Sequence, residues 1–479
     1  MRMTSRRLYL EFLTDEELTG IEETAYRLLD EVGLALQHAR ATEMLHGRGC
    51  RVAERVFIPR STVEWALANL RNANIYRNRD GTAELILGDG QIRFHNSGGP
   101  PNVLDLETGQ RRPATVRDCC DMARLLDALP GVDVVIPLFG PQDAPGELMS
   151  IAATEATLRN TTKPTVGGTA ENPDEVRYKL ELLAACCGGP AAFRSRPTGA
   201  VSVSPVSPLT FTEKVTGAML KALEMGAPLR PLPAPSLGAT APITMAAALA
   251  QQHAEILASF VIAAAACPGA AVSYSSRISP LDMRTGTSTW GGPEIGMTAA
   301  AAAQLAHRIG FVCNAYGLSS SAGQLDPQFG YERFSNSMMA ALGGVDILSG
   351  VGGMSSGLSG GFEVAAMDDE LISVIKYIVN GCAVDEATLA FDVMKEVIPG
   401  ERSFLGQMHT VRHMRAGALW GTRVSGRAAG GQEARDVVAR ARSRAQEILR
   451  THTVEPLPDA VSRELTEIVE RARRELVKA

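Results

Sequence analysis

Hydrophobic and polar positions follow a regular alternation along most of this chain, beginning near residue 115. Short apolar runs typical of buried strands alternate with longer stretches that carry apolar residues at helical spacing. Strands that alternate with helices imply right-handed parallel crossovers. The expected strands are residues 132–139, 164–168, 199–203, 227–232, 270–274, 311–316, 345–349 and 388–393. Eight such units predict an α/β fold, a (β/α)8 TIM barrel, because the open-sheet alternative lacks its G-x-G-x-x-G fingerprint.

The segments that flank this pattern differ from it. Residues 15–40 have helical spacing behind Thr14, which forms a capping-box pattern with Glu17, and residues 61–70 predict a second helix. Short β patterns follow at 73–77, 83–87 and 91–95. The C-terminal residues are rich in Arg, Glu and Ala at helical spacing. We therefore predict three units: an N-terminal α+β extension (1–114), the barrel (115–430) and a C-terminal helical tail (431–479).

Composition narrows the class of protein. Of the 479 residues, 45% are hydrophobic and 21% are charged, as in ordinary globular proteins. The net charge of −6 and the lack of a run of basic residues give no indication of a basic surface that would bind nucleic acid. The chain start has no apolar signal region, and the apolar run 256–267 is too short to span a bilayer. We expect a soluble cytoplasmic protein, with no metal site, whose eight cysteines are free thiols.

Candidate catalytic residues follow the strand predicted at 311–316. The segment 314–332 is a long polar loop that leads into a helix, which is where α/β enzymes place their chemistry. Asp326, Gln328 and Glu332 are the candidates, and the two carboxylates would supply negative potential for a cation. Asp326 precedes Pro327 at a helix start, so a capping role is an equally good interpretation for it.

Aromatic side chains are scarce in this chain, at 5%, yet three of them stand at predicted strand ends. Phe139, Tyr274 and Tyr316 are candidates for binding a quaternary ammonium through their ring faces, with plain packing as the alternative. Arg277 and Arg284 are candidates for holding a carboxylate, unless they are solvated loop residues or ion-pair partners. Further substrate-binding candidates follow the predicted strand ends: Phe329, Tyr331 and His409.

Two other features have weaker chemical signals. The glycine-rich run 350–361 lacks the P-loop pattern, so it predicts either a phosphate site or a low rim that a bulky cofactor can approach. His409 and His413 lie four residues apart, which is a possible metal-ligand spacing. No third ligand stands nearby in the sequence, so ordinary helix histidines are the simpler interpretation.

Four segments in order resemble the trimethylamine methyltransferase family of corrinoid-dependent methyltransferases. They are NVLDLETGQRRPAT (102–115), QLDPQFGYE (324–332), GGVDILSGVGGMSSG (343–357) and IPGERSFLGQMHTVRHMR (398–415). The N-terminal LLDEVGLALQHARATEML (28–45) also fits. The resemblance covers nearly the whole chain.

The resemblance implies a TIM barrel that moves a methyl group from an amine to the cob(I)alamin of a separate corrinoid protein, with no cofactor bound tightly to this chain. Trimethylamine-specific members carry pyrrolysine, and its position falls near Gly323, where this chain has ordinary residues. Members without pyrrolysine resemble the glycine betaine methyltransferase type. The expected substrate is therefore a quaternary amine such as glycine betaine, and we expect a homo-oligomer.

Two other hypotheses stay open at this point. The chain could act on another methyl donor such as a tertiary methylamine, or it could be a non-catalytic barrel that docks a corrinoid protein. The polar loop at 314–332 and the strand-end aromatics argue against loss of catalysis.

Overall fold

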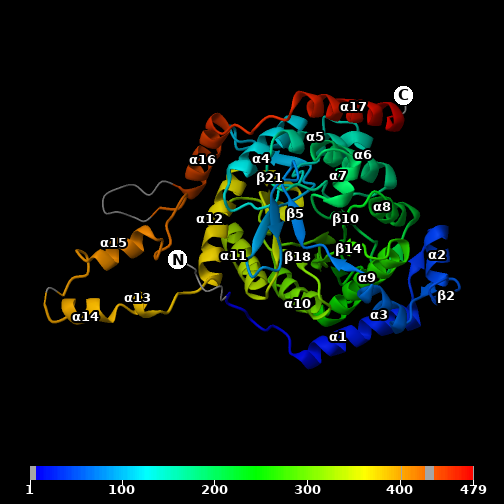
Figure 1. Cartoon of the computed structure of the whole chain (residues 1–479), viewed down its shortest axis with the longest axis horizontal. Coiled ribbons are helices and arrows are strands. Elements are labelled where there is room, and N and C mark those ends of the chain that lie inside the picture. Colours follow the sequence, from blue (N-terminus) through cyan, green and yellow to red (C-terminus); the bar gives the residue numbers. More distant parts are fainter. Residues whose placement is uncertain (1–6, 401, 427–435, 478–479) are drawn as a thin grey trace.

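Parallel strands form the centre of the molecule, and helices surround them (Figure 1). The computed structural model describes residues 7–400, 402–426 and 436–477. The central strands are β7 (Arg93–Asn96), β10 (Val201–Val203), β12 (Leu229–Pro231), β14 (Ala271–Val272), β15 (Tyr274–Ser276), β18 (Cys313–Tyr316) and β19 (Ile347–Val351). Their residues are almost all buried, as expected when helices cover a parallel sheet.

The strand pairings run around the centre and return to their start. β7 joins residues 132–139 through the bridge His95–Val134, and Val135 pairs with Thr165. Thr169 then pairs with Ser202 of β10. Parallel pairing continues from β10 through β12 to β14, then from β15 through β18 and β19 back to β7. This arrangement is a barrel-like α/β fold.

The structure corrects two of the predicted strands. Residues 91–95 were expected in the N-terminal extension, but β7 is a central strand that pairs with β19. Residues 388–393 were expected as the eighth strand, but they lie in α13 (Glu386–Leu389) and α14 (Phe391–Val397). The side chain of Asp385 caps α13, and Leu389 and Phe391 are exposed rather than buried. A short apolar run does not separate strand from helix, which explains the second error.

Eight helices follow the strands in the chain and pack outside them. They are α4 (Val116–Ala128), α5 (Met149–Arg159), α6 (Pro173–Cys186), α8 (Glu213–Glu224), α9 (Met245–Ala266), α10 (Glu294–Arg308), α11 (Pro327–Leu342) and α12 (Phe362–Val379). Side-chain caps begin several of them, for example Thr115 at α4 and Asn172 at α6. Helix α9 is apolar and long enough to cross a membrane, but it is mostly buried within the fold.

The N-terminal residues cover one side of the centre. Helix α1 (Asp15–Arg27) begins with the predicted capping box of Thr14 and Glu17, and it packs against α9. A π-helical turn (Leu28–Val32), α2 (Ala39–His46) and α3 (Arg60–Ala68) follow. The remaining short strands are β1 (Ala35–Leu36), β2 (Arg51–Val52), β3 (Val56–Phe57), β4 (Arg71–Asn72), β5 (Ile75–Arg77), β6 (Glu84–Ile86), β8 (Asn102–Leu104), β9 (Arg111–Pro113), β11 (Thr210–Phe211), β13 (Ser236–Leu237), β16 (Ser279–Asp282), β17 (Thr287–Ser288), β20 (Gly353–Met354) and β21 (Ser359–Gly361).

The C-terminal part leaves the centre and then returns to it (Figure 1). Helices α13, α14 and α15 (Met408–Arg415) project to one side, and α15 carries His409 and His413. Helix α16 (Val437–Thr451) packs on α12 and α4, and α17 (Asp459–Leu476) packs on α6 and α5. The tail therefore packs two helices on the barrel-like centre. Its predicted start at residue 431 lies outside the described residues.

Candidate active site

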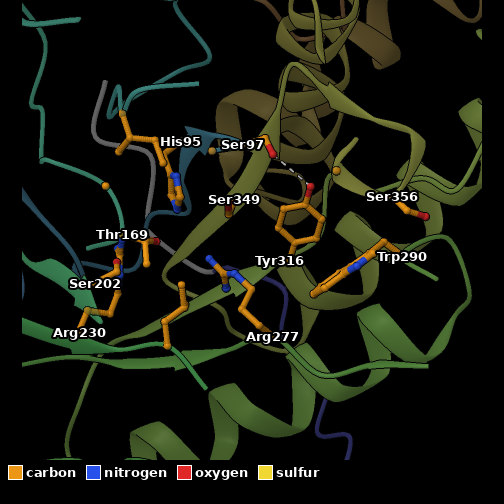
Figure 2. Close-up of a pocket in the computed structure, with 15 residues that line it drawn as sticks. His95, Ser97, Thr169, Ser202, Arg230, Arg277, Trp290, Tyr316, Ser349 and Ser356 are labelled. Atoms are coloured by element: carbon orange, nitrogen blue, oxygen red, sulfur yellow. Dashed lines mark hydrogen bonds between the residues drawn. The ribbon is translucent and has the colours of Figure 1, made fainter. Parts of the chain in front are cut away.

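A cavity of about 240 Å³ opens at the carboxyl ends of the central strands. Strand residues and the loops that follow them supply its lining, as in barrel enzymes. Figure 2 shows most of these side chains around one space. The lining residues are His95, Ser97, Gly98, Ile136, Gly168, Thr169, Ser202, Arg230, Leu232, Arg277, Trp290, Tyr316, Ser349, Ser356 and Gly357.

Two arginines dominate the charge of this cavity, one of them buried and the other partly buried. Arg230 on β12 is 3% exposed and donates hydrogen bonds to Ser202 Oγ (2.9 Å) and Tyr76 Oη (3.1 Å). Arg277 follows β15 and donates to Ser276 O (2.7 Å) and Asn314 Oδ1 (2.5 Å). No lining residue is a carboxylate. Buried or partly buried cations without a counterion favour an anionic ligand.

The two guanidinium groups also influence each other. Burial, followed by the charge of Arg230, lowers the pKa of Arg277 to about 9. Arg277 is still protonated at neutral pH. Burial and the nearby charge of Arg230 make this protonated form less favourable, and an anion bound in the cavity would stabilise it.

His95 is a neutral member of the same network. Burial, together with the charges of Arg230 and Arg277, holds the pKa of His95 well below its usual range. Its Nδ1 lies 2.8 Å from Asn96 O, and its Nε2 lies 2.8 Å from Asn314 Nδ2. The carbonyl accepts from Nδ1–H, which leaves Nε2 to accept from the amide of Asn314. Asn314 therefore links the imidazole to Arg277 and fixes the direction of both.

Two aromatic rings form another wall of the cavity. Trp290 and Tyr316 stand edge to face, with centroids 5.1 Å apart and planes at 76°. The Tyr316 hydroxyl lies 3.3 Å from Ser97 Oγ, and the Arg277 guanidinium lies 5.7 Å from the Tyr316 ring. Rings in such a partly desolvated site attract a quaternary ammonium through their quadrupoles. The cavity thus combines an anion-binding part with a cation-binding part.

The three predicted catalytic residues lie behind the cavity rather than in its lining. Glu332 is buried and accepts from Ser320 Oγ (2.7 Å), from Ser321 N (2.9 Å) and from Gln328 Nε2 (2.7 Å). Asp326 caps α11 by accepting from Phe329 N (3.0 Å), which is the alternative role considered for it.

Through these contacts, Glu332 and Gln328 support the loop that holds the aromatic wall of the cavity. Ser321, which Glu332 holds, accepts a hydrogen bond at Oγ from Trp290 N at 3.0 Å. The loop therefore connects the buried carboxylate to the aromatic wall. The sequence pattern predicted these residues near the site because they follow β18, but their side chains do not line the cavity.

The predicted substrate-binding residues divide into two groups. Arg277 and Tyr316 line the cavity, and Phe139 lines a larger cavity of about 720 Å³ that adjoins it. Tyr274 is fully buried elsewhere, with its hydroxyl 3.0 Å from His253 Nδ1. The side chain of Arg284 is 92% exposed, and its Nε lies 3.5 Å from Asp282 Oδ1, so it is a solvated loop residue with an ion-pair partner.

Three further candidates also lie away from the cavity lining. Phe329 is buried in a cluster with Ala322, Met354 and Val364, where it serves packing. Tyr331 is 63% exposed on the outer face of α11. His409 lies in α15 with its ring centroid 4.2 Å from that of His413. No group of three possible metal ligands occurs within the part of the chain that the structure describes.

Several lining residues were absent from the sequence prediction. Arg230 stands inside the apolar run APLRPLP, and a charged residue within a predicted buried strand was a usable signal. Trp290 is one of only three tryptophans and follows a predicted strand end, which was a weaker signal. His95 ends the β pattern predicted at 91–95, but that pattern was assigned to the N-terminal extension, so its place at the end of a central strand was not recognised.

The larger cavity and the glycine-rich segment shape the approach to the site. The two cavities share Gly98, Ile136, Gly168 and Thr169. Gly168 has φ +70°, a left-handed conformation that favours glycine, and Gly357, which also lines the first cavity, has φ +80°. Because glycine has no side chain, neither residue narrows the opening of the cavity at its position. This favours the interpretation of the glycines as a means of close approach by a large group.

Comparison with known proteins agrees with these features. The family model described as trimethylamine methyltransferase (MTTB) matches residues 2–477. The chain is 30% identical to a trimethylamine methyltransferase MttB of Desulfitobacterium hafniense, over 96% of this chain and 94% of that protein. It is 29% identical to a glycine betaine methyltransferase of the same species, over 83% of each chain.

The fold also resembles a solved structure. The monomethylamine methyltransferase MtmB of Methanosarcina barkeri superimposes with a TM-score of 0.54 and 13% identity, covering 100% of this chain and 91% of that one. At this identity the likeness concerns the fold alone, and it supports a barrel-like architecture. With the family model matched over almost every residue, the chain belongs to the trimethylamine methyltransferase family.

Proposed function

We propose that this protein transfers a methyl group from a zwitterionic quaternary amine, with glycine betaine as the first choice, to the cob(I)alamin of a separate corrinoid protein. We further propose that the barrel-like centre is a (β/α)8 barrel in which this transfer takes place. One observation carries the substrate proposal: two arginines and two aromatic rings line the same cavity, and its lining contains no carboxylate.

The arginines would bind the carboxylate of the substrate. Arg230 and Arg277 are held by neutral partners, Ser202, Tyr76 and Asn314, so both charges are available to an anion. A guanidinium donates parallel hydrogen bonds to a carboxylate with matched geometry. A simple amine cation such as trimethylammonium would bring a third positive charge into this space. The cavity therefore favours a betaine over an amine without an acidic group.

The aromatic wall would hold the ammonium of the same molecule. Trp290 and Tyr316 offer ring faces on one side of the cavity, and Arg277 lies beside Tyr316. With the carboxylate bound to the arginines, the short link of a betaine keeps its ammonium close to these rings. Such two-point binding orients a methyl group and removes water from it.

Methyl transfer then needs little acid–base chemistry from this chain. The C–N bond breaks, its electron pair stays on nitrogen, and the leaving group is a neutral tertiary amine, so no proton has to be delivered. The corrinoid supplies the nucleophile that accepts the methyl group. His95 is neutral and held by Asn96 and Asn314, which suits a positioning role. The adjoining cavity of about 720 Å³ gives room for a large group to approach.

A comparison of methyl donors tests this proposal. Purified protein is mixed with chemically reduced cob(I)alamin and one donor, and formation of methylcobalamin is followed by its absorbance. Choline is the matched control for glycine betaine, because it keeps the trimethylammonium group and replaces the carboxylate with a hydroxymethyl group. We expect methylation with glycine betaine, or with proline betaine or carnitine, and much slower methylation with choline and trimethylamine. Equal rates with choline, or no methylcobalamin from any betaine, would overturn the proposal.

A tertiary methylamine is the second candidate substrate, because the relative with 30% identity is named a trimethylamine methyltransferase. The positive charge of the cavity disfavours it. Preferential methylation with trimethylamine in the same assay would support this candidate and exclude the first.

A further inference from the structure

A projecting segment, residues 382–417, extends away from the barrel-like centre, and we refer to it as the arm (Figure 1). It contains α13, α14 and α15. The chain leaves α12 just before the arm and returns to α12 just after it. Tyr377 Oη donates to Ala418 O (2.8 Å), and Trp420 Nε1 donates to Ser373 Oγ (3.0 Å). Both ends of the arm are thus anchored at one place.

The arm exposes an unusual amount of apolar surface. Nine of its large apolar side chains are exposed, with Leu405 at 86%, Met408 at 75% and Val384 at 74%. The others are Leu389, Phe391, Met394, Ile398, Phe404 and Met414. At about 150 Å² or more for each large side chain, the exposed fractions correspond to roughly 900 Å². The largest apolar patch on a typical monomer is about 300–600 Å².

The arm also lacks support from its own chain. Apart from the bond that Ala418 N donates to His413 O at the end of the arm, the hydrogen bonds found for its described residues are made within the arm, for example Thr388 N to Asp385 Oδ1 and Thr410 Oγ1 to Phe404 O. Its helices have 4, 7 and 8 residues. Helices of this length are not stable alone in water, because the cost of nucleation exceeds the gain from a few bonds. Packing against another molecule would supply what is missing.

Helices α11 and α12 carry four further exposed large apolar side chains outside the arm. On α11, Tyr331 is 63% exposed and Phe334 is 40% exposed. On α12, Tyr377 and Ile378 are 42% and 37% exposed. We call these four residues the α11–α12 patch. A chain with two unsatisfied apolar surfaces can cover both by pairing with a copy of itself.

We propose that two copies of this chain exchange arms, so that the arm of each copy packs on the α11–α12 patch of the other. Such a contact is reciprocal, as a two-fold axis requires. Each arm offers roughly 900 Å², which matches the surface of about 800 Å² that each partner buries in a stable interface. The patch includes α11, the helix that carries Glu332, so the contact also lies next to the loop that supports the aromatic wall.

Light scattering after size-exclusion chromatography tests the proposal with the full chain. We expect the wild type to contain an even number of chains, and the double variant Leu405→Glu/Met408→Glu to run as single chains. The matched control is Ile243→Glu/Met283→Glu, which adds the same charges at positions that are 67% and 57% exposed outside the arm. A wild type that is a single chain, or an arm variant that keeps the mass of the wild type, overturns the proposal. Circular dichroism checks that both variants remain folded.

Cross-linking identifies the surface that the arm contacts. Two differently tagged chains are prepared with Cys382, which is exposed, replaced by serine; one carries Leu405→Cys and the other Phe334→Cys. After the chains are mixed, a short bismaleimide should link the two tags. A mixture of Leu405→Cys with Ile243→Cys is the control and should remain unlinked. No link between the first pair, or equal linking in the control, refutes contact of the arm with the patch.

Discussion

Replacing Arg277 by methionine removes one of the two positive charges while keeping a long side chain in the cavity. In the wild type, Arg277 contacts Ser276 O, Asn314 Oδ1 and the space beside Tyr316. A hydrogen bond to a charged partner contributes about 1.5–3 kcal/mol. Loss of one such bond to a substrate carboxylate should therefore lower kcat/KM for glycine betaine roughly 10- to 150-fold. Arg230 remains, so activity should fall but not vanish.

The pattern of donors distinguishes this explanation from a damaged site. Choline has no carboxylate, so its kcat/KM should fall far less, and the ratio of choline to betaine activity should rise in Arg277→Met. Arg284→Met removes the same charge from a side chain that is 92% exposed, and it should leave both values unchanged. Initial rates of methylcobalamin formation at several donor concentrations provide the constants. An equal loss for choline and glycine betaine would refute carboxylate binding by Arg277, since damage to the fold affects both donors.

Three further outcomes are expected. Trp290→Leu should raise KM for a betaine about 2- to 30-fold, measured by initial rates, because a cation–π contact contributes about 0.5–2 kcal/mol; an unchanged KM would contradict it. Arg333→Met should cost about 3–5 kcal/mol in urea unfolding, since it leaves Asp368 buried and unpaired; a loss below about 1 kcal/mol would count against this. Burial lowers the pKa of Lys163 to about 8, so between pH 8 and 10.5 the unfolded chain binds more protons than the folded chain. The free energy of unfolding of the wild type should therefore rise with pH relative to that of Lys163→Met; parallel plots of this free energy against pH would contradict it.

The alternation of strands and helices was enough to predict the centre of the fold. Seven of the eight predicted strands lie where the structure has central strands or bridges, because buried parallel strands read as continuous apolar runs. The eighth was wrong, and β7 was missed as a central strand. Its partner β19 lies about 250 residues later in the chain, and no local pattern contains that pairing.

Part of the site could be predicted because its residues follow strands that the sequence pattern located. Arg277 and Tyr316 were found because they follow strands that the pattern located correctly. Asp326, Gln328 and Glu332 were found by the same rule, but the rule does not say which way a side chain turns. Glu332 turns toward Ser320 and Ser321 because their donors satisfy its buried charge. Such choices depend on three-dimensional partners and cannot be taken from one sequence.

The pairing of β7 with β19 also has a consequence for synthesis of the protein. A ribosome adds about 5–20 residues each second, so β7 waits roughly 13–50 s before β19 has been made. During that interval β7 and the growing strands expose unpaired edges, which are templates for aggregation. Truncation before Ile347 would make the delay permanent. Shorter fragments of this protein should therefore depend strongly on chaperones and should accumulate as insoluble material.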